Sequence, residues 1–191
     1  IWGSRILKKV KLIKNFMNTD LKQVNMPKKK KWDRSKKKKD KEQLIKISRI
    51  SKVTKGGKKI SFRVVLVVGD DNGKVGLGVA KASDVSLAFE KARSNGYKNL
   101  IQVSLTKSLS IPHQVEASFG ACKLILKPAM KGSGVIAGGA TRSVLQRAGI
   151  KNVIAKQLGA NNLLNNAKAT ICALEKLTTK SAALKKRNLI K

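Results

Sequence analysis

The sequence predicts an α+β protein of two small domains with a basic N-terminal tail. Three observations carry this prediction. Short β-branched runs alternate with glycine turns and helical patterns, which is typical of mixed sheets and helices. The chain has 191 residues, a length that suits two small domains. The strand and helix pattern restarts after a linker, "SLSIPH" at 108–113, so we expect two units.

The first predicted domain spans 44–108 and has the order β-β-β-α-β. Its strands alternate apolar and polar residues or are rich in β-branched residues, and glycine turns separate them. The helical pattern begins behind Ser83, which we expect to be its N-cap. The predicted elements are strands at 44–54, 59–69, 74–80 and 100–105 and a helix from 83 or 84 to 96.

The second predicted domain spans 109–180 and has the order β-β-α-β-α. A hairpin, "QVEASFG" followed by "CKLILKPA", comes first, and a glycine-rich loop then leads into a helix that Gly149 closes. The predicted elements are strands at 114–120, 122–129 and 151–157 and helices at 140–148 and 161–178. The polar and basic residues 181–191 are predicted to form a tail.

Positive charge points to a polyanionic partner. Residues 1–43 carry 16 Lys and Arg against four acidic residues, so we expect an extended tail that orders on a polyanion. The whole chain has 43 Lys and Arg against ten acids, a net charge of +33, which favours nucleic acid as the partner. Aromatic residues are scarce, so phosphates rather than stacked bases are the expected contacts. No apolar run approaches the ~18–20 residues that span a bilayer, so we expect no membrane partner.

Two glycine-rich segments partly match nucleotide-binding motifs. "KGSGVIAGGATRSVLQRAGI" at 131–150 matches G-x-x-x-x-G, but Ala140 stands where a P-loop has lysine, although Thr141 is in place. "GLG" at 76–78 lacks the third glycine of a dinucleotide fingerprint because Lys81 stands there, so we interpret it as a tight turn. For the longer loop, close packing and contact with an RNA phosphate both stay open, and nucleotide hydrolysis is disfavoured.

The residues offer no catalytic constellation. No two carboxylates are placed for acid–base work, since Asp70 and Asp71 fall in a turn. Cys122, Cys172 and His113 lack metal-ligand spacing. We therefore expect no enzyme, no cofactor, no metal and no small-molecule substrate, and a function in binding.

Two long segments resemble one known family. "SRISKVTKGGKKISFRVVLVVGDDNGKVGLGVAKASDV" and "PAMKGSGVIAGGATRSVLQRAGIKNVIAKQLGANN" resemble, in this order, ribosomal protein S-five, the fifth protein of the bacterial-type small ribosomal subunit. The likeness runs from about Leu44 to Thr178. "AKQLGANNLLNNAKA" at 155–169 looks like the cyanobacterial and plastid branch. The resemblance therefore implies a plastid location, with the bacterial cytoplasm as the alternative.

The resemblance also implies a fold and a function. The first domain would be double-stranded-RNA-binding-like, and the second would be of the ribosomal S-five domain 2-like type, whose kinship with small-molecule kinases explains the glycine loop. The protein would be a structural constituent of the small ribosomal subunit. It would bind small-subunit rRNA, contact proteins S-four and S-eight near the mRNA entry channel, and support translational accuracy. The alternatives are a kinase-like nucleotide-binding enzyme and a free-standing dsRNA-binding regulator.

The resemblance places an rRNA-facing hairpin at 49–59, and further basic residues extend the expected RNA surface. The expected RNA-binding residues are Arg49, Lys52, Lys55, Gly56, Gly57, Lys58, Lys59, Arg63, Lys74, Lys131 and Arg142. An S-four contact surface is implied in the second domain, and the S-eight side would lie near the last helix. The expected interface residues are Ala117, Ser118, Phe119, Gly120 and Lys123.

Two positions depart from the family's pattern. Ala80 stands where a third glycine is usual in G-x-G-x-G-K-A, which costs stability if the backbone there needs a positive φ. Leu163 replaces the proline usual in N-N-P-L-N, and we expect this change to loosen the entry to the last helix.

Overall fold

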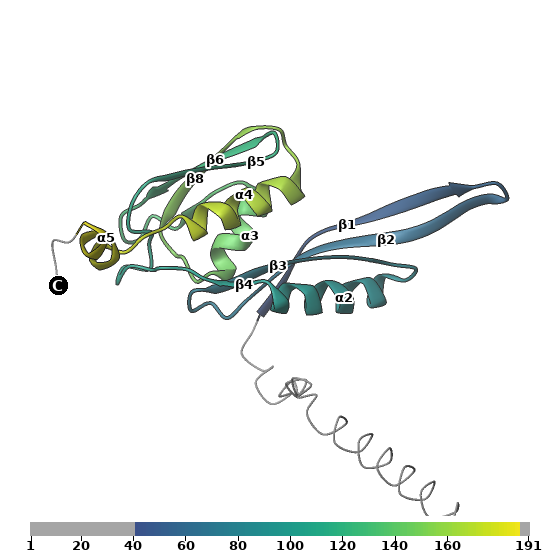
Figure 1. Cartoon of the computed structure of the whole chain (residues 1–191), viewed down its shortest axis with the longest axis horizontal. Coiled ribbons are helices and arrows are strands. Elements are labelled where there is room, and N and C mark those ends of the chain that lie inside the picture. The colour runs from purple at the N-terminus through teal and green to yellow at the C-terminus, as the bar shows by residue number, and fades with distance from the viewer. Residues whose placement is uncertain (1–40, 188–191) are drawn as a thin grey trace, which may run out of the picture. The chain divides into compact units, whose positions relative to one another are not determined.

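The computed structural model describes residues 41–187, shown in colour in Figure 1. Within this range the chain forms two four-stranded sheets and four helices. The predicted tail at 1–43 lies outside the described residues except for its last three, which begin the first strand. Residues 188–191 also lie outside the description.

The first sheet has four antiparallel strands in the order β1-β2-β3-β4. The strands are β1 (Lys41–Thr54), β2 (Gly57–Gly69), β3 (Lys74–Ala82) and β4 (Leu100–Gln102). Helix α2 (Val85–Lys98) lies along one face of this sheet (Figure 1). This is the predicted β-β-β-α-β order.

The N-cap of helix α2 lies one residue later than expected. Asp84, not Ser83, is the N-cap, and its Oδ1 accepts the Val85 N–H at 2.7 Å. A carboxylate at this position also interacts favourably with the positive end of the helix dipole.

The glycines of "GLG" lie inside β3, so their interpretation as a tight turn was wrong. They permit close contact between the sheet and α2. A Cβ on Gly78 would overlap the backbone oxygen of Ala92, and one on Gly76 would overlap that of Gly96.

The second sheet has the order β5-β6-β8-β7. Its strands are β5 (Val115–Phe119), β6 (Cys122–Pro128), β7 (Val135–Ile136) and β8 (Val153–Gly159). Its helices are α3 (Gly139–Arg147) and α4 (Leu163–Glu175), followed by the short helix α5 (Lys180–Lys186). Strand β7 pairs with β8 in parallel, and the glycine-rich sequence around it gave no strand signal. Helix α5 occupies much of the segment predicted as a C-terminal tail.

The larger of two hydrophobic clusters in residues 41–187 joins the two sheets. Val64, Leu66 and Val68 of β2 pack with α2, whereas Val65 and Val67, on the opposite face, belong to a larger cluster. That cluster continues through α3 and α4 to the second sheet, where it includes Leu124, Leu126 and Val153. Strand β2 is therefore buried on both faces, which explains its unbroken run "VVLVV".

The C-terminal end of α3 is fixed to the turn between β2 and β3. The Arg147 guanidinium donates to Gln43 Oε1 at 3.2 Å and pairs with Asp71 Oδ1 at 3.4 Å. The Asp71 N–H in turn donates to the Arg147 carbonyl at 3.3 Å. Gly149 ends the helix with φ +82°, and a Cβ there would overlap the Asp71 carbonyl oxygen.

The departure at Ala80 carries no backbone strain. Ala80 lies in β3 and pairs with Val64 of β2. It does not have a positive φ: among the described residues other than glycine, Asp71 and Leu109 do. At Leu163, the first residue of α4, the helix entry is held by the cap: Asn162 Oδ1 accepts the Leu164 N–H at 3.2 Å.

We therefore expect the substitution Ala80→Gly, which restores the usual family residue, to destabilise this protein by about 0.5–1 kcal/mol. The glycine would lose more conformational freedom on folding and would gain nothing from a positive φ. Urea unfolding of the two proteins measures the difference. A more stable glycine variant would contradict this account of the position.

Candidate nucleic-acid interface

The longest projecting feature is the β1–β2 hairpin. Its strands pair from Lys41 with Gly69 to Thr54 with Gly57, so Lys55 and Gly56 form a two-residue turn. The hairpin extends well beyond the part of the sheet that α2 covers (Figure 1). It therefore presents its outer half to solvent on both faces.

The glycines at the tip differ in role. Gly57 has φ +142°, a value that side chains rarely adopt, whereas Gly56 needs no positive φ. A Cβ on either residue would meet no atom within 4 Å. Their small size is thus not required by packing within the described chain, and the open space leaves the backbone accessible to a partner.

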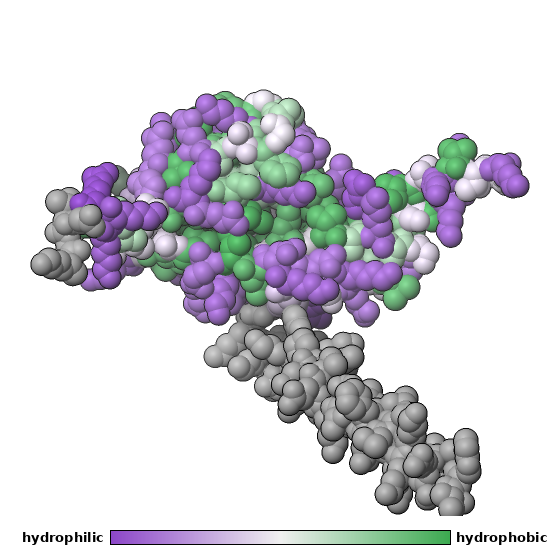
Figure 2. Space-filling model, in the orientation of Figure 1, coloured by the Kyte–Doolittle hydropathy of each residue, from purple (hydrophilic) through white to green (hydrophobic). Residues whose placement is uncertain are grey.

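Basic side chains lie on both faces of the outer hairpin. Because directly paired residues share a face, Arg49 lies with Phe62, and Lys58 lies with Val53 on the same side. Lys52 and Lys59 pair on the opposite side, which Arg63 shares. Figure 2 shows hydrophilic residues at the outer end, with hydrophobic residues just behind them; the exposed apolar side chains there are Val53 and Ile60.

The hairpin gathers most of the predicted RNA-binding residues, but not all. Lys74 begins β3 at the end of the sheet away from the tip, where its backbone N–H donates to Asp70 Oδ1. Lys131 lies in the turn before β7, and Arg142 lies on the exposed side of α3. These three cations belong to surfaces separate from the hairpin.

A second basic surface was not predicted. Lys81 of β3 and Lys91 and Lys98 of α2 line one shallow depression, in which Glu90 is the one acidic residue. The spacing of seven residues between Lys91 and Lys98 places them on one face of the helix, so this signal was present in the sequence.

The glycine loop does not have the side chains of a nucleotide site. Ala140 is buried, and Thr141 is buried and hydrogen-bonded to Gln157 and Thr170. The Gln157 side chain also lies against Gly138, where a Cβ would come within 2.7 Å of its Oε1. Within residues 41–187 there is no cluster of three or more His, Cys, Asp or Glu that would hold a metal ion, and no helix there is long and apolar enough to cross a membrane.

The expected S-four surface corresponds to the β5–β6 hairpin. Ala117 is buried, so its side chain faces the core, and Gly120 forms the turn with φ +57°. Phe119 is partly exposed, and the Lys168 ammonium lies 4.9 Å from its ring centroid. Lys123 pairs with Glu116 at 3.0 Å. Near its turn, this hairpin thus exposes one aromatic ring, a charge pair and the Ser118 side chain.

Comparison with known proteins covers both sheets. Residues 41–104 match the family model for ribosomal protein S5, N-terminal domain, and residues 117–187 match that for ribosomal protein S5, C-terminal domain. The small ribosomal subunit protein uS5c of Phaeodactylum tricornutum is 63% identical over 175 residues, which cover 91% of this chain and 99% of the relative. The uS5c of Cyanidium caldarium is 57% identical over 75% of this chain and 85% of the relative. The uS5 of Microcystis aeruginosa is 52% identical over 86% of this chain and 96% of the relative.

Proposed function

Since the chain belongs to the ribosomal protein S5 family, a family of structural constituents of the small ribosomal subunit, we propose that it binds small-subunit rRNA through the β1–β2 hairpin. We place it in the plastid ribosome, because relatives named uS5c reach 63% identity. We propose no catalytic role, since the glycine loop is packed against Gln157 and lacks the P-loop lysine.

One observation carries the RNA-binding proposal. The outer hairpin holds Arg49, Lys52, Lys55, Lys58 and Lys59, and within residues 41–187 no ion pair involves any of them. Like charges held together on a narrow ribbon repel one another, and a phosphate backbone relieves that repulsion. The open space around Gly56 and Gly57 lets a phosphate approach the backbone of the tip without side-chain obstruction.

We extend the proposal to the neighbours on the subunit. The β5–β6 hairpin, with the exposed ring of Phe119, is assigned to protein S-four, and the region near α4 and α5 to protein S-eight. A position near the mRNA entry channel, where the protein would support translational accuracy, follows from the same assignment.

The hairpin is tested by the double substitution Lys55→Ala with Lys58→Ala. The free energy of unfolding, measured by thermal denaturation, should change by no more than about 0.5 kcal/mol, because both side chains are exposed. The slope of log K for rRNA against log salt should become shallower by about 0.9 for each phosphate that the variant no longer neutralises. Incorporation into small subunits in competition with the unchanged protein should fall.

A matched control removes the same charge from the second domain, with Lys127→Ala and Lys151→Ala, both exposed. It should incorporate better than the hairpin variant. Gly57→Val should lower both stability and incorporation, because a β-branched residue resists a positive φ. Incorporation of the hairpin variant at the unchanged level would show that the tip does not contact RNA.

A further inference from the structure

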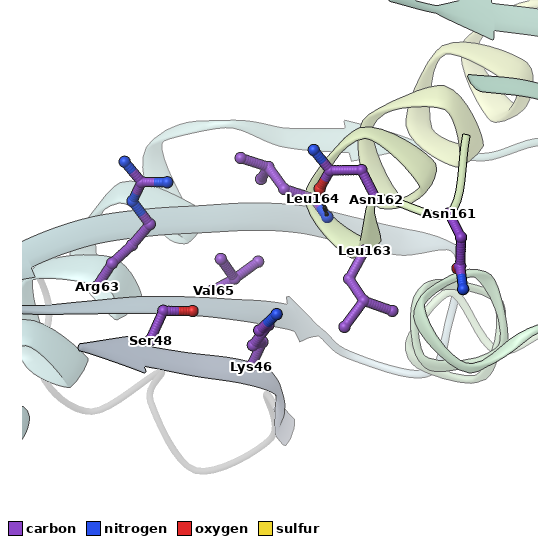
Figure 3. A pocket seen from close by; sticks show the side chains of 8 residues that line it. All are labelled: Lys46, Ser48, Arg63, Val65, Asn161, Asn162, Leu163 and Leu164. Atoms are coloured by element: carbon purple, nitrogen blue, oxygen red, sulfur yellow. Dashed lines mark hydrogen bonds between the residues drawn. The ribbon is translucent and has the colours of Figure 1, made fainter. Parts of the chain in front are cut away.

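A cavity of about 590 Å³ lies between the inner part of the β1–β2 hairpin and the start of α4. Figure 3 shows Lys46, Ser48, Arg63 and Val65 on the hairpin strands, with Leu163 and Leu164 extending toward them from the start of α4. The cavity therefore joins residues from the first and second sheets' domains. It is separate from the hairpin tip and from the glycine loop.

The cavity carries positive charge without a counter-charge. Lys46 and Arg63 line it, and no carboxylate does. Among the described residues, neither cation forms an ion pair. The Arg63 Nε is shielded from solvent and has no hydrogen-bond partner within the described chain. Because no carboxylate lines the cavity, an anion that enters it would meet both cations without displacing a counter-charge.

A β-bulge sets this arrangement. The pairing of β1 with β2 shifts between Leu44 and Lys46, so that Lys46 lies opposite Val65 and Ser48 opposite Arg63. Because side chains alternate along a strand, a shift of one residue would place Lys46 and Ser48 on the other face of the sheet. The bulge thus brings two polar side chains of β1 to the face that Arg63 shares.

The helix side of the cavity supplies further polar groups and an apolar surface. Asn161 and Asn162 are both exposed, and the Asn162 Oδ1 already accepts the Leu164 N–H. Its amide NH₂ group remains a donor. Leu163 and Val65 line the space between the polar residues. Two cations and an amide donor together suit a tetrahedral oxyanion.

We propose that this cavity binds one phosphate group of the rRNA backbone, held by Arg63 and Lys46. The proposal rests on the rRNA-binding function proposed above. It adds a second anchor point close to where the two domains meet, so the RNA contact would hold the hairpin and α4 together. Inorganic phosphate has the same chemistry, and the experiment separates the two sources.

The test compares Ser48→Glu with Ser48→Gln in the full chain. The two substitutions differ in charge at nearly equal volume. The glutamate lies opposite Arg63 across the strand pair and neutralises it, whereas the glutamine does not. Arg63 Nε–H is followed by NMR during titration with inorganic phosphate, and rRNA affinity is measured over a range of salt concentrations. Urea unfolding of both variants establishes that they are folded.

In the unchanged protein and in Ser48→Gln, we expect phosphate to shift the Arg63 Nε–H signal in a saturable way. Ser48→Glu should abolish this shift. It should also bind rRNA roughly tenfold more weakly than Ser48→Gln, with a salt slope shallower by about 0.7–0.9. That slope difference corresponds to one phosphate fewer held by the protein.

Three results would overturn the proposal. If phosphate shifts Arg63 but the two variants bind rRNA equally, the cavity takes a free anion and not the RNA backbone. If phosphate leaves Arg63 unchanged and the variants are equal, the cavity binds no phosphate. If Ser48→Gln weakens rRNA binding as much as Ser48→Glu, bulk rather than charge is responsible. In each case steep salt-dependent binding by the unchanged protein would leave the hairpin proposal standing, whereas its absence would refute the rRNA function itself.

Discussion

Replacing Gly149 by alanine is expected to destabilise the protein by about 2–5 kcal/mol. Gly149 has φ +82°, and the left-handed conformation costs a residue with a side chain about 1–2 kcal/mol. In addition, the new Cβ would overlap the carbonyl oxygen of Asp71, and overpacking against backbone costs about 1–3 kcal/mol. The decrease in stability is measured by urea unfolding at constant temperature.

Gly134 provides the matched control for Gly149. It has a similar φ of +73°, but a Cβ there would meet no atom within 4 Å. Gly134→Ala should therefore lose about 1–2 kcal/mol from backbone strain alone. The excess destabilisation in Gly149→Ala measures the close packing between α3 and the β2–β3 turn. Equal destabilisation of the two variants would mean that this packing adds nothing to stability.

Replacing Leu145 by alanine is expected to cost about 3–5 kcal/mol. Leu145 is fully buried on α3, in the core cluster that reaches both sheets. Truncating a leucine in such a site removes apolar burial and leaves a cavity. Since one cluster reaches both sheets, unfolding by urea should be coupled between them. The unfolding midpoints followed at the backbone amides of Leu66 in β2 and Leu124 in β6 should therefore fall together.

Leu158→Ala is the control for the core substitution, because Leu158 on β8 is 40% exposed. Its destabilisation should be clearly smaller. A shift of the Leu124 midpoint alone in Leu145→Ala would show that the two sheets unfold independently, and that the continuous core does not couple them.

Much of the fold was predictable from local patterns. The β-branched run of β2 indicated a strand, and Gly149 correctly marked the end of α3, because a helix commonly stops at a glycine with positive φ. The sequence pattern could not decide whether Ser83 or Asp84 is the N-cap, since both side chains suit that position. Strand β7 has two residues and depends on its parallel pairing with β8, which is a tertiary contact without a local signal.

The candidate site was predictable in part. The sequence marks the hairpin tip, because lysines flank two glycines between two strands. Lys46 and Ser48 were missed because the alternation of residues along β1 does not show which face of the sheet they occupy. The bulge between Leu44 and Lys46 decides that face. Their partner residues, at 161–164, lie more than a hundred positions away in the chain. Such a cavity depends on how the domains pack, which no local pattern records. The RNA-binding and interface residues remain predictions until the variants above are measured.

The β1–β2 hairpin should be rigid at its base and more mobile toward its tip. Val64, Leu66 and Val68 at its base are fully buried, so they are released only when the whole core opens. Val53 and Ile60 near the tip are largely exposed, and a two-stranded ribbon without a covering layer is marginally stable in water. The outer ribbon can therefore open and twist at small free-energy cost while its base stays fixed. A polyanion that binds the outer ribbon would have to order it, and the entropy lost in doing so would lower the affinity of the tip relative to that of the base.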